Sequence, residues 1–141
     1  MITPNSPPLS AVLLAAAEQI AAVQAGTSLR EAIARTPAPL RAASQAHSFY
    51  TLRHLGLARA LQRQMVAKAP KSALFNALLQ QSLLLMLERP NAPQYQTHTL
   101  VNQAVQATQA KKSLRPYKNL LNAVLRRFGR EFDAQMAQAL K

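Results

Sequence analysis

The side chains best suited to chemistry in this sequence are basic and amide groups near its carboxyl end. Residues 111–130 contain seven lysines and arginines and no acid. At 100° per residue, a helix over 114–128 gathers its Arg, Lys and Asn side chains on one arc. This arc offers hydrogen-bond donors throughout, which suits phosphate oxygens and base edges of RNA. The candidate RNA-binding residues in this stretch are Lys111, Lys112, Arg115, Lys118, Asn119, Asn122, Arg126, Arg127 and Arg130.

A second basic stripe lies earlier in the chain. Arg53, Arg59 and Arg63 are its candidate RNA-binding residues, and Lys68 and Lys71 extend it. The sequence leaves open whether the two stripes form one continuous surface. It also leaves open a plainer interpretation, in which both stripes are solvated faces of a basic protein.

Three tyrosines are candidates for stacking on RNA bases. Tyr50 and Tyr117 fall on apolar helix faces, which favours packing in the core for both side chains. Tyr95 falls in a proline-containing loop, so we expect it to be the more exposed of the three.

The residues that usually carry catalysis are few and scattered. The chain has five Asp and Glu, three His and no Cys, which excludes disulfides, thiol nucleophiles and Cys-based metal sites. His47 and His54 are seven residues apart with no carboxylate near them, which does not make a zinc site. The three glycines are isolated, so no phosphate-binding glycine loop is present. We expect no catalytic, metal-binding or cofactor-binding residue in these 141 positions.

Composition and charge point to a polyanionic partner. Lysine and arginine number 17 against five acids, a formal net charge of +12. The longest unbroken apolar run is far shorter than a membrane span, so we expect no membrane segment. The opening residues lack the basic region of a secretory signal, which favours a cytoplasmic location.

An Ala- and Leu-rich composition with three glycines predicts an all-α domain, a compact bundle of seven or eight helices. Residues 1–8 are expected to form a flexible lead, and residues 9–141 the domain.

Gly26 is expected to end the first helix, and Ser28, Ser72 and Ser113 are expected as amino-terminal caps. Gly56 marks a break or kink. The expected helices begin at Leu9 and Ser28 and then cover 40–54, 57–68, 72–89, 97–111, 114–128 and 130–140.

Residues 72–89 are the predicted central helix, because they are apolar on most sides. Their polar strip is narrow and holds Asn76, Gln80 and Gln81. Residues 1–25 carry a single charge, which makes them the best candidate for an apolar surface in an alternative role as a protein-interaction module. The helix over 40–54 is predicted to direct one set of side chains inward: Leu40, Ala43, Ala46, Phe49 and Tyr50.

Several short segments resemble the NusB-like fold in the right order along the chain. Residues 119–128, NLLNAVLRRF, resemble its closing "NAVLR" signature, and residues 101–105, VNQAV, are similar to its "VNEAV" run. Residues 49–53, FYTLR, resemble an aromatic and Leu-Arg segment of the same family, and residues 26–29, GTSL, look like its "GxSL" turn. The GTSL turn, residues 52–55 and the absence of bases before Arg30 are most similar to the amino-terminal domain of Sun/RsmB-type 16S rRNA (cytosine-C5) methyltransferases.

This resemblance implies a non-catalytic domain that positions small-subunit ribosomal RNA for catalysis elsewhere. The implied partners are ribosomal RNA and a carboxyl-terminal catalytic domain of the same polypeptide, absent from these residues. S-adenosylmethionine is implied as the cofactor of that domain, and none is expected in this chain. A free-standing transcription antitermination factor of the NusB type is the alternative that the same resemblance implies.

Overall fold

The computed structural model describes residues 6–87, 89–90 and 92–141 of the chain. Residues 1–5 of the predicted flexible lead lie outside the described residues. Over the described ranges the fold is all-α, with eight α-helices and two 3-10 helices in a compact bundle, as predicted. The helices are α1 (Leu9–Gln24), α2 (Leu29–Ala34), η1 (Ala38–Leu40), α3 (Arg41–Arg53), α4 (Leu55–Met65), α5 (Ala73–Leu85), α6 (Thr97–Ala110), η2 (Lys112–Tyr117), α7 (Lys118–Arg130) and α8 (Phe132–Ala139).

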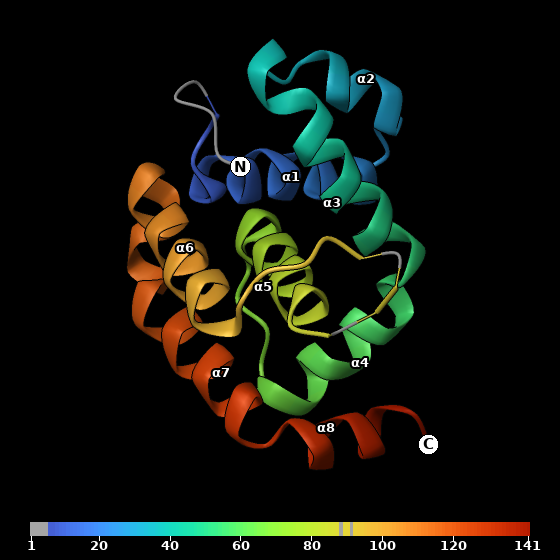
Figure 1. Cartoon of the computed structure of the whole chain (residues 1–141), viewed down its shortest axis with the longest axis vertical. Helices are drawn as coiled ribbons and strands as arrows, with labels where there is room; N and C mark the ends of the chain where they lie inside the picture. Colours follow the sequence, from blue (N-terminus) through green and yellow to red (C-terminus); the bar gives the residue numbers. More distant parts are fainter. Residues whose placement is uncertain (1–5, 88, 91) are drawn as a thin grey trace.

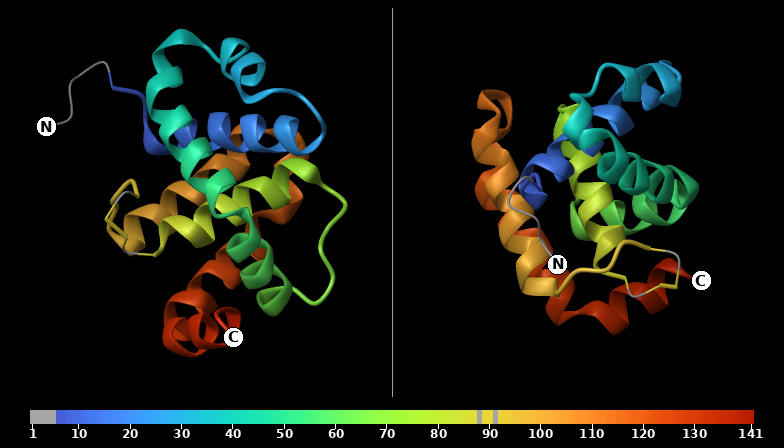
Figure 2. Two further views of the ribbon diagram at one scale, coloured as in Figure 1. Left: turned by 90° about the vertical axis from the view of Figure 1, so that its right-hand side faces the viewer. Right: turned by 45° about the horizontal axis from the view of Figure 1, so that its top comes forward.

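Helix α5 is the centre of the bundle, as its composition predicts. Leu78, Leu79 and Leu83 have no exposed surface. Helices α1, α3, α4, α6 and α7 all pack on α5, which Figure 1 shows in the middle of the molecule and Figure 2 shows from two further sides. The helix ends at Leu85, earlier than the predicted Arg89. Met86 and Leu87 leave the helix in a turn but stay buried, so the apolar run is longer than the helix itself.

Two of the three amides in the predicted polar strip of α5, Gln80 and Gln81, are also buried, because neighbouring helices satisfy them, whereas Asn76 is only partly buried. The Nε2 group of Gln80 donates to Gln62 of α4 at 2.9 Å, and its Oε1 accepts from Gln24 of α1 at 3.0 Å. The Nε2 group of Gln81 donates to the carbonyl oxygen of Leu13 in α1 at 3.0 Å. Hydrogen bonding of this kind offsets the cost of burying an amide.

Local sequence signals place three of the helix ends. Gly26 adopts a φ of 110°, which favours glycine, and ends α1. Ser28 and Ser72 each accept a hydrogen bond from the backbone N–H three residues later, at 3.1 Å. The break between α3 and α4 falls at His54 instead of the predicted Gly56.

The predicted cap at Ser113 is wrong. The chain first forms the 3-10 helix η2, which has no side-chain cap, and α7 begins only at Lys118. Pro116 explains the difference, because proline disfavours the α conformation of the residue before it and donates no hydrogen bond.

The predicted orientation of α3 is wrong for three of its residues. Ala43 and Ala46 are exposed, and the side chain of Phe49 retains 50% of its accessible surface. Leu40, in η1, is only partly buried, whereas Tyr50 is buried as predicted. The side chains of α3 that face the interior are mostly polar: Ser44, His47, Ser48 and Thr51.

Gln19 of α1 explains this inversion. Its Nε2 group donates to Ser44 at 2.9 Å and to Thr36 at 2.8 Å, and its Oε1 accepts from Ser48 at 2.5 Å. The imidazole of His47 makes a 2.8 Å hydrogen bond with Gln81 of α5. Partners on two other helices therefore make the polar side of α3 the buried side.

The low charge of the first helix has a different cause from the one predicted. Helix α1 packs against α2, α3, α5 and α6, and Leu13, Ala16 and Ile20 have no exposed surface. Over Leu9–Gln24 it is therefore a core helix, and the prediction that it forms an apolar interaction surface is wrong.

Candidate nucleic-acid interface

Helix α7 presents the predicted cationic face because its apolar side is anchored in the core. Leu121, Leu125 and Phe128 have no exposed surface, and Val124 retains only 5%. Burial of these four side chains fixes the rotation of the helix about its axis. The opposite side must then face solvent. The residues that it exposes include Lys118, Asn119, Arg126, Arg127 and Arg130, while Asn122 is partly buried.

The 3-10 helix η2 extends this face toward α6. Tyr117 stacks on Phe75 of α5 with ring centroids 4.8 Å apart, which attaches η2 to the core. Tyr117 is thus a packing residue, as its apolar position predicts. The Nε group of Arg115 donates to the carbonyl oxygen of Gln109 at 3.1 Å, while Lys112 is exposed.

Not all the predicted cations are equally available. Lys111 makes an ion pair of 2.9 Å with Glu18 of α1, and Arg127 makes one of 3.1 Å with Glu131. Hydrogen bonds from Gln135 and Arg127 lower the pKa of Glu131. Among the described residues, Lys112, Arg115, Lys118, Arg126 and Arg130 form no ion pair, although the charge of Arg130 still acts on Glu131.

A cavity of about 570 Å³ adjoins the carboxyl-terminal end of this face. Arg126 and Arg130 line it from α7, and Thr97 and His98 line it from the start of α6. The sequence pattern did not indicate Thr97 or His98, because they lie about thirty positions before the arginines. The Nε group of Arg126 also donates to Oδ1 of Asn122 at 2.9 Å, which positions the guanidinium beside the helix.

The second basic stripe is a separate surface. Arg59 and Arg63 are exposed on α4, as predicted, and line a cavity of about 380 Å³ with Gln62 and Asn76. Helix α4 packs on α5 and α8, and Figure 1 shows it on the other side of α5 from α7. Arg53, at the end of α3, is exposed but lines a different cavity.

The tyrosines proposed for base stacking are committed to protein contacts. Tyr50 is buried, and its hydroxyl donates to the carbonyl oxygen of Leu84 at 3.4 Å. The hydroxyl of Tyr95 is hydrogen-bonded to Nε2 of His47 at 2.8 Å, although 37% of Tyr95 stays exposed, in line with its predicted exposure. Burial raises the pKa of both tyrosines.

Comparison of the chain with models of protein families, with curated proteins and with solved structures gave no match in any of the three.

Two findings concern metal sites and membrane spans. No group of three His, Asp or Glu side chains is placed to hold a metal ion in residues 6–87, 89–90 and 92–141. Across the same residues, no helix has both the length and the apolar character needed to cross a membrane.

Proposed function

We propose that this chain is a non-catalytic RNA-binding domain that holds single-stranded RNA along η2 and α7. One observation carries the proposal: the exposed cations Lys112, Arg115, Lys118, Arg126 and Arg130 share a surface on which residues 112–130 supply no acid. A formal net charge of +12 adds a long-range attraction for a polyanion. The asparagines between the cations supply amide groups that can reach base edges.

The resemblance of residues 101–105 and 119–128 to NusB-like sequences supports a finer proposal. In this proposal the domain positions small-subunit ribosomal RNA for an S-adenosylmethionine-dependent cytosine-C5 methyltransferase domain of the same polypeptide. A free-standing antitermination factor is the alternative, and it would use the same RNA-binding face. The full natural gene product distinguishes them, because only the first requires a catalytic domain downstream.

Salt dependence of RNA binding tests the coarser proposal. For single strands, log affinity falls with log salt concentration at about −0.7 for each phosphate contacted, so five contacts give a slope near −3.5. Fluorescence anisotropy of a labelled single-stranded RNA between about 50 and 200 mM salt measures this slope. Absence of binding, or binding that does not change with salt, would contradict the proposal.

Two matched triple variants locate the site. Replacing Arg115, Lys118 and Arg126 with Ala is expected to weaken binding and to reduce the size of the slope by about 2. Replacing Arg59, Arg63 and Lys68 with Ala removes the same charge from the other stripe. This variant is expected to keep most of the slope of log affinity against log salt concentration. The opposite result would move the site to α4. Circular dichroism checks that both variants stay folded.

A further inference from the structure

A third cavity, of about 640 Å³, lies on a part of the surface that the face on α7 does not include. The carboxyl-terminal half of α3 forms one wall with Phe49 and Arg53. Pro90 and Pro93, which lie between α5 and α6 in the chain, form another wall. The volume falls in the range of small-ligand pockets, about 300–1,000 Å³.

Phe49 is the unusual side chain in this cavity. Half of its surface is exposed, and it is one of three large apolar or aromatic side chains left exposed in the described part of the chain. The exposure follows from the inverted orientation of α3, because its polar face is hydrogen-bonded inside. Arg53 lies four residues later on the same helix face, so a flat ring and a cation stand side by side.

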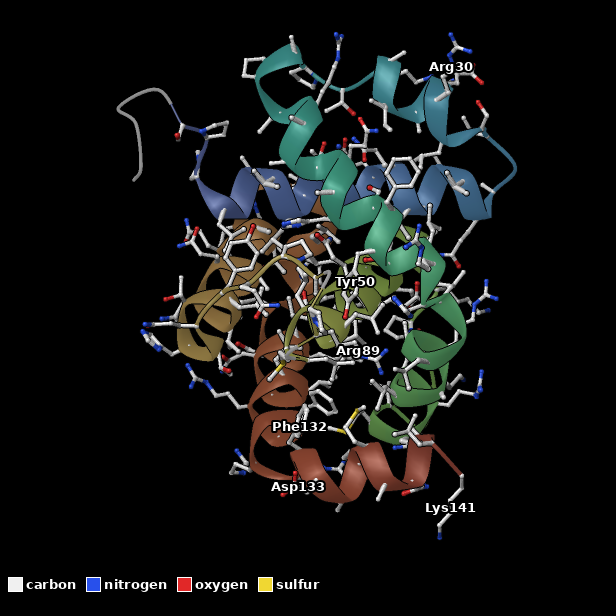
Figure 3. All side chains as sticks on the ribbon, turned by 45° about the vertical axis from the view of Figure 1, so that its right-hand side comes forward. Arg30, Tyr50, Arg89, Phe132, Asp133 and Lys141 are labelled. Atoms are coloured by element: carbon white, nitrogen blue, oxygen red, sulfur yellow. The ribbon has the colours of Figure 1, made fainter. Side chains whose placement is uncertain are left out.

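The charge around this cavity is positive. Arg53 and His54 line it, and among the described residues that line it none is acidic. Burial raises the pKa of Tyr50 and lowers the pKa of His54. The positive charge of Arg89 is a weaker influence on both groups and acts to lower each pKa. Figure 3 shows Arg89 beside Tyr50. Two guanidinium groups therefore act on the same opening.

The inner wall of the cavity is held in place. The rings of Tyr50 and His54 meet edge to face with centroids 5.0 Å apart. The Tyr50 hydroxyl is hydrogen-bonded to the backbone of α5. A rigid wall lowers the cost of ordering a ligand against it.

We propose that this cavity binds one nucleotide of a single-stranded RNA, with its base stacked on Phe49 and its phosphate held by Arg53. The proposal rests on the proposed RNA-binding function and adds a base-contacting site to it. Stacking on an aromatic ring accepts any base, because every base has a π-face. The site therefore fixes a position along the strand without selecting its sequence.

An acidic protein segment is the competing occupant, and the geometry favours the nucleotide. A carboxylate needs only the cations, which leaves the exposed ring and the flanking prolines without a partner. A nucleotide supplies both a flat apolar surface and an anion within one residue of the polymer. The described residues that line the cavity come from the carboxyl-terminal half of α3, from His54 and from Pro90, Ala92 and Pro93, and this small lining suits a compact ligand.

The chain has no tryptophan, so Phe49→Trp creates a single fluorescent reporter in the cavity. Titration with a single-stranded RNA octamer is expected to quench this fluorescence, with the same midpoint as the anisotropy of the labelled octamer. Leu140→Trp places a control reporter at a 65% exposed position in the carboxyl-terminal turn after α8 and is expected to show no quenching. An octamer of the same charge with abasic sites is expected to bind without quenching Phe49→Trp.

Phe49→Ala provides a second readout without tryptophan. It is expected to weaken octamer binding at least about fivefold, with the salt slope unchanged, because stacking releases no counterions. The inference would be overturned if the octamer bound without quenching Phe49→Trp and if Phe49→Ala bound it as tightly as the unmodified chain. That result would leave the proposed function intact. No octamer binding by the unmodified chain would overturn both. Quenching by polyglutamate at lower concentration than by the octamer would assign the cavity to an acidic protein.

Discussion

Helices α3 and α7 are of equal length, but they bury opposite kinds of side chain. Helix α7 buries Leu121, Leu125 and Phe128 and exposes its arginines and lysines. Helix α3 buries Ser44, Ser48 and other polar groups and exposes alanines and a phenylalanine. Both orientations follow the same requirement, which is that buried polar atoms have hydrogen-bond partners, and the hydroxyl of Thr51 on α3 is the exception among the described residues.

The difference shows what decides the orientation of a helix. Guanidinium and ammonium groups must stay in contact with water, so α7 has one possible buried face. Hydroxyl groups can be buried when an amide lies opposite them, and Gln19 provides that amide for Ser44 and Ser48. The orientation of α3 therefore depends on a residue of another helix.

Truncation of the α7 anchor is expected to have the largest effect. Phe128→Ala should lower the free energy of unfolding by about 3–5 kcal/mol, because it leaves a cavity in the core and removes a ring contact with Phe132. Arg126→Ala, two residues away on the exposed face, should change it by less than about 0.5 kcal/mol. Urea unfolding measures both. Equal losses in the two variants would mean that α7 is not anchored by its apolar side.

Loss of a buried hydroxyl on α3 is expected to come next. Ser48→Ala removes the donor to Oε1 of Gln19 and leaves that oxygen buried without it. The expected loss is about 1–3 kcal/mol of unfolding free energy, the usual cost of an unsatisfied buried polar atom. Ala46→Ser, on the exposed side of the same helix, is the control and should have little effect. A neutral Ser48→Ala would show that the inverted face is not held by this network.

The imidazole on the same face makes stability depend on pH. Burial lowers the pKa of His47 below its ordinary value of 6.5, although the hydrogen bond with Gln81 acts in the other direction. The unfolded chain therefore takes up this proton first as the pH falls. The stabilisation is complete above pH 6.5 and is lost as the pH falls through the lower pKa of the folded state.

Chemical denaturation between pH 7.5 and about 5 measures this loss, whose slope for one proton cannot exceed about 1.4 kcal/mol per pH unit. His47→Gln should reduce the slope and leave the contribution of His54, whose pKa burial also lowers. The same slope in the variant and in the unmodified chain would exclude His47 as its source.

The smallest expected effect has the opposite sign. Within the described residues, the hydroxyl of Thr51 is buried without a hydrogen-bond partner. Thr51→Val replaces it with a methyl group of similar size and should raise the free energy of unfolding by about 1 kcal/mol. Thermal unfolding of this variant beside Ser48→Ala compares an unbonded and a bonded hydroxyl on one buried face. A destabilised Thr51→Val would indicate a partner for this hydroxyl in solution.

The sequence predicts those features whose causes are local. The caps at Ser28 and Ser72, the end of α1 at Gly26 and the two faces of α7 all follow from residues within one or two turns. The central position of α5 follows from its composition alone, because no exposed face could carry that many leucines.

The features that the sequence did not predict depend on residues distant in the chain. The orientation of α3 needs Gln19, and the separation of the two basic stripes needs the position of α5 between them. The cavity beside Phe49 needs Pro90 and Pro93 to lie opposite the carboxyl-terminal half of α3. No periodicity within a single helix contains that information.

The two buried glutamines of α5 have a consequence for the uniqueness of the fold. A helix lined with leucine on nearly every side could turn about its own axis and still bury apolar surface. Gln80 and Gln81 remove that freedom, because their amides reach partners on α1, α3 and α4 in only one rotation. These hydrogen bonds fix the rotation of α5 relative to the helices that pack on it. They therefore also influence the direction in which α7 points its arginines.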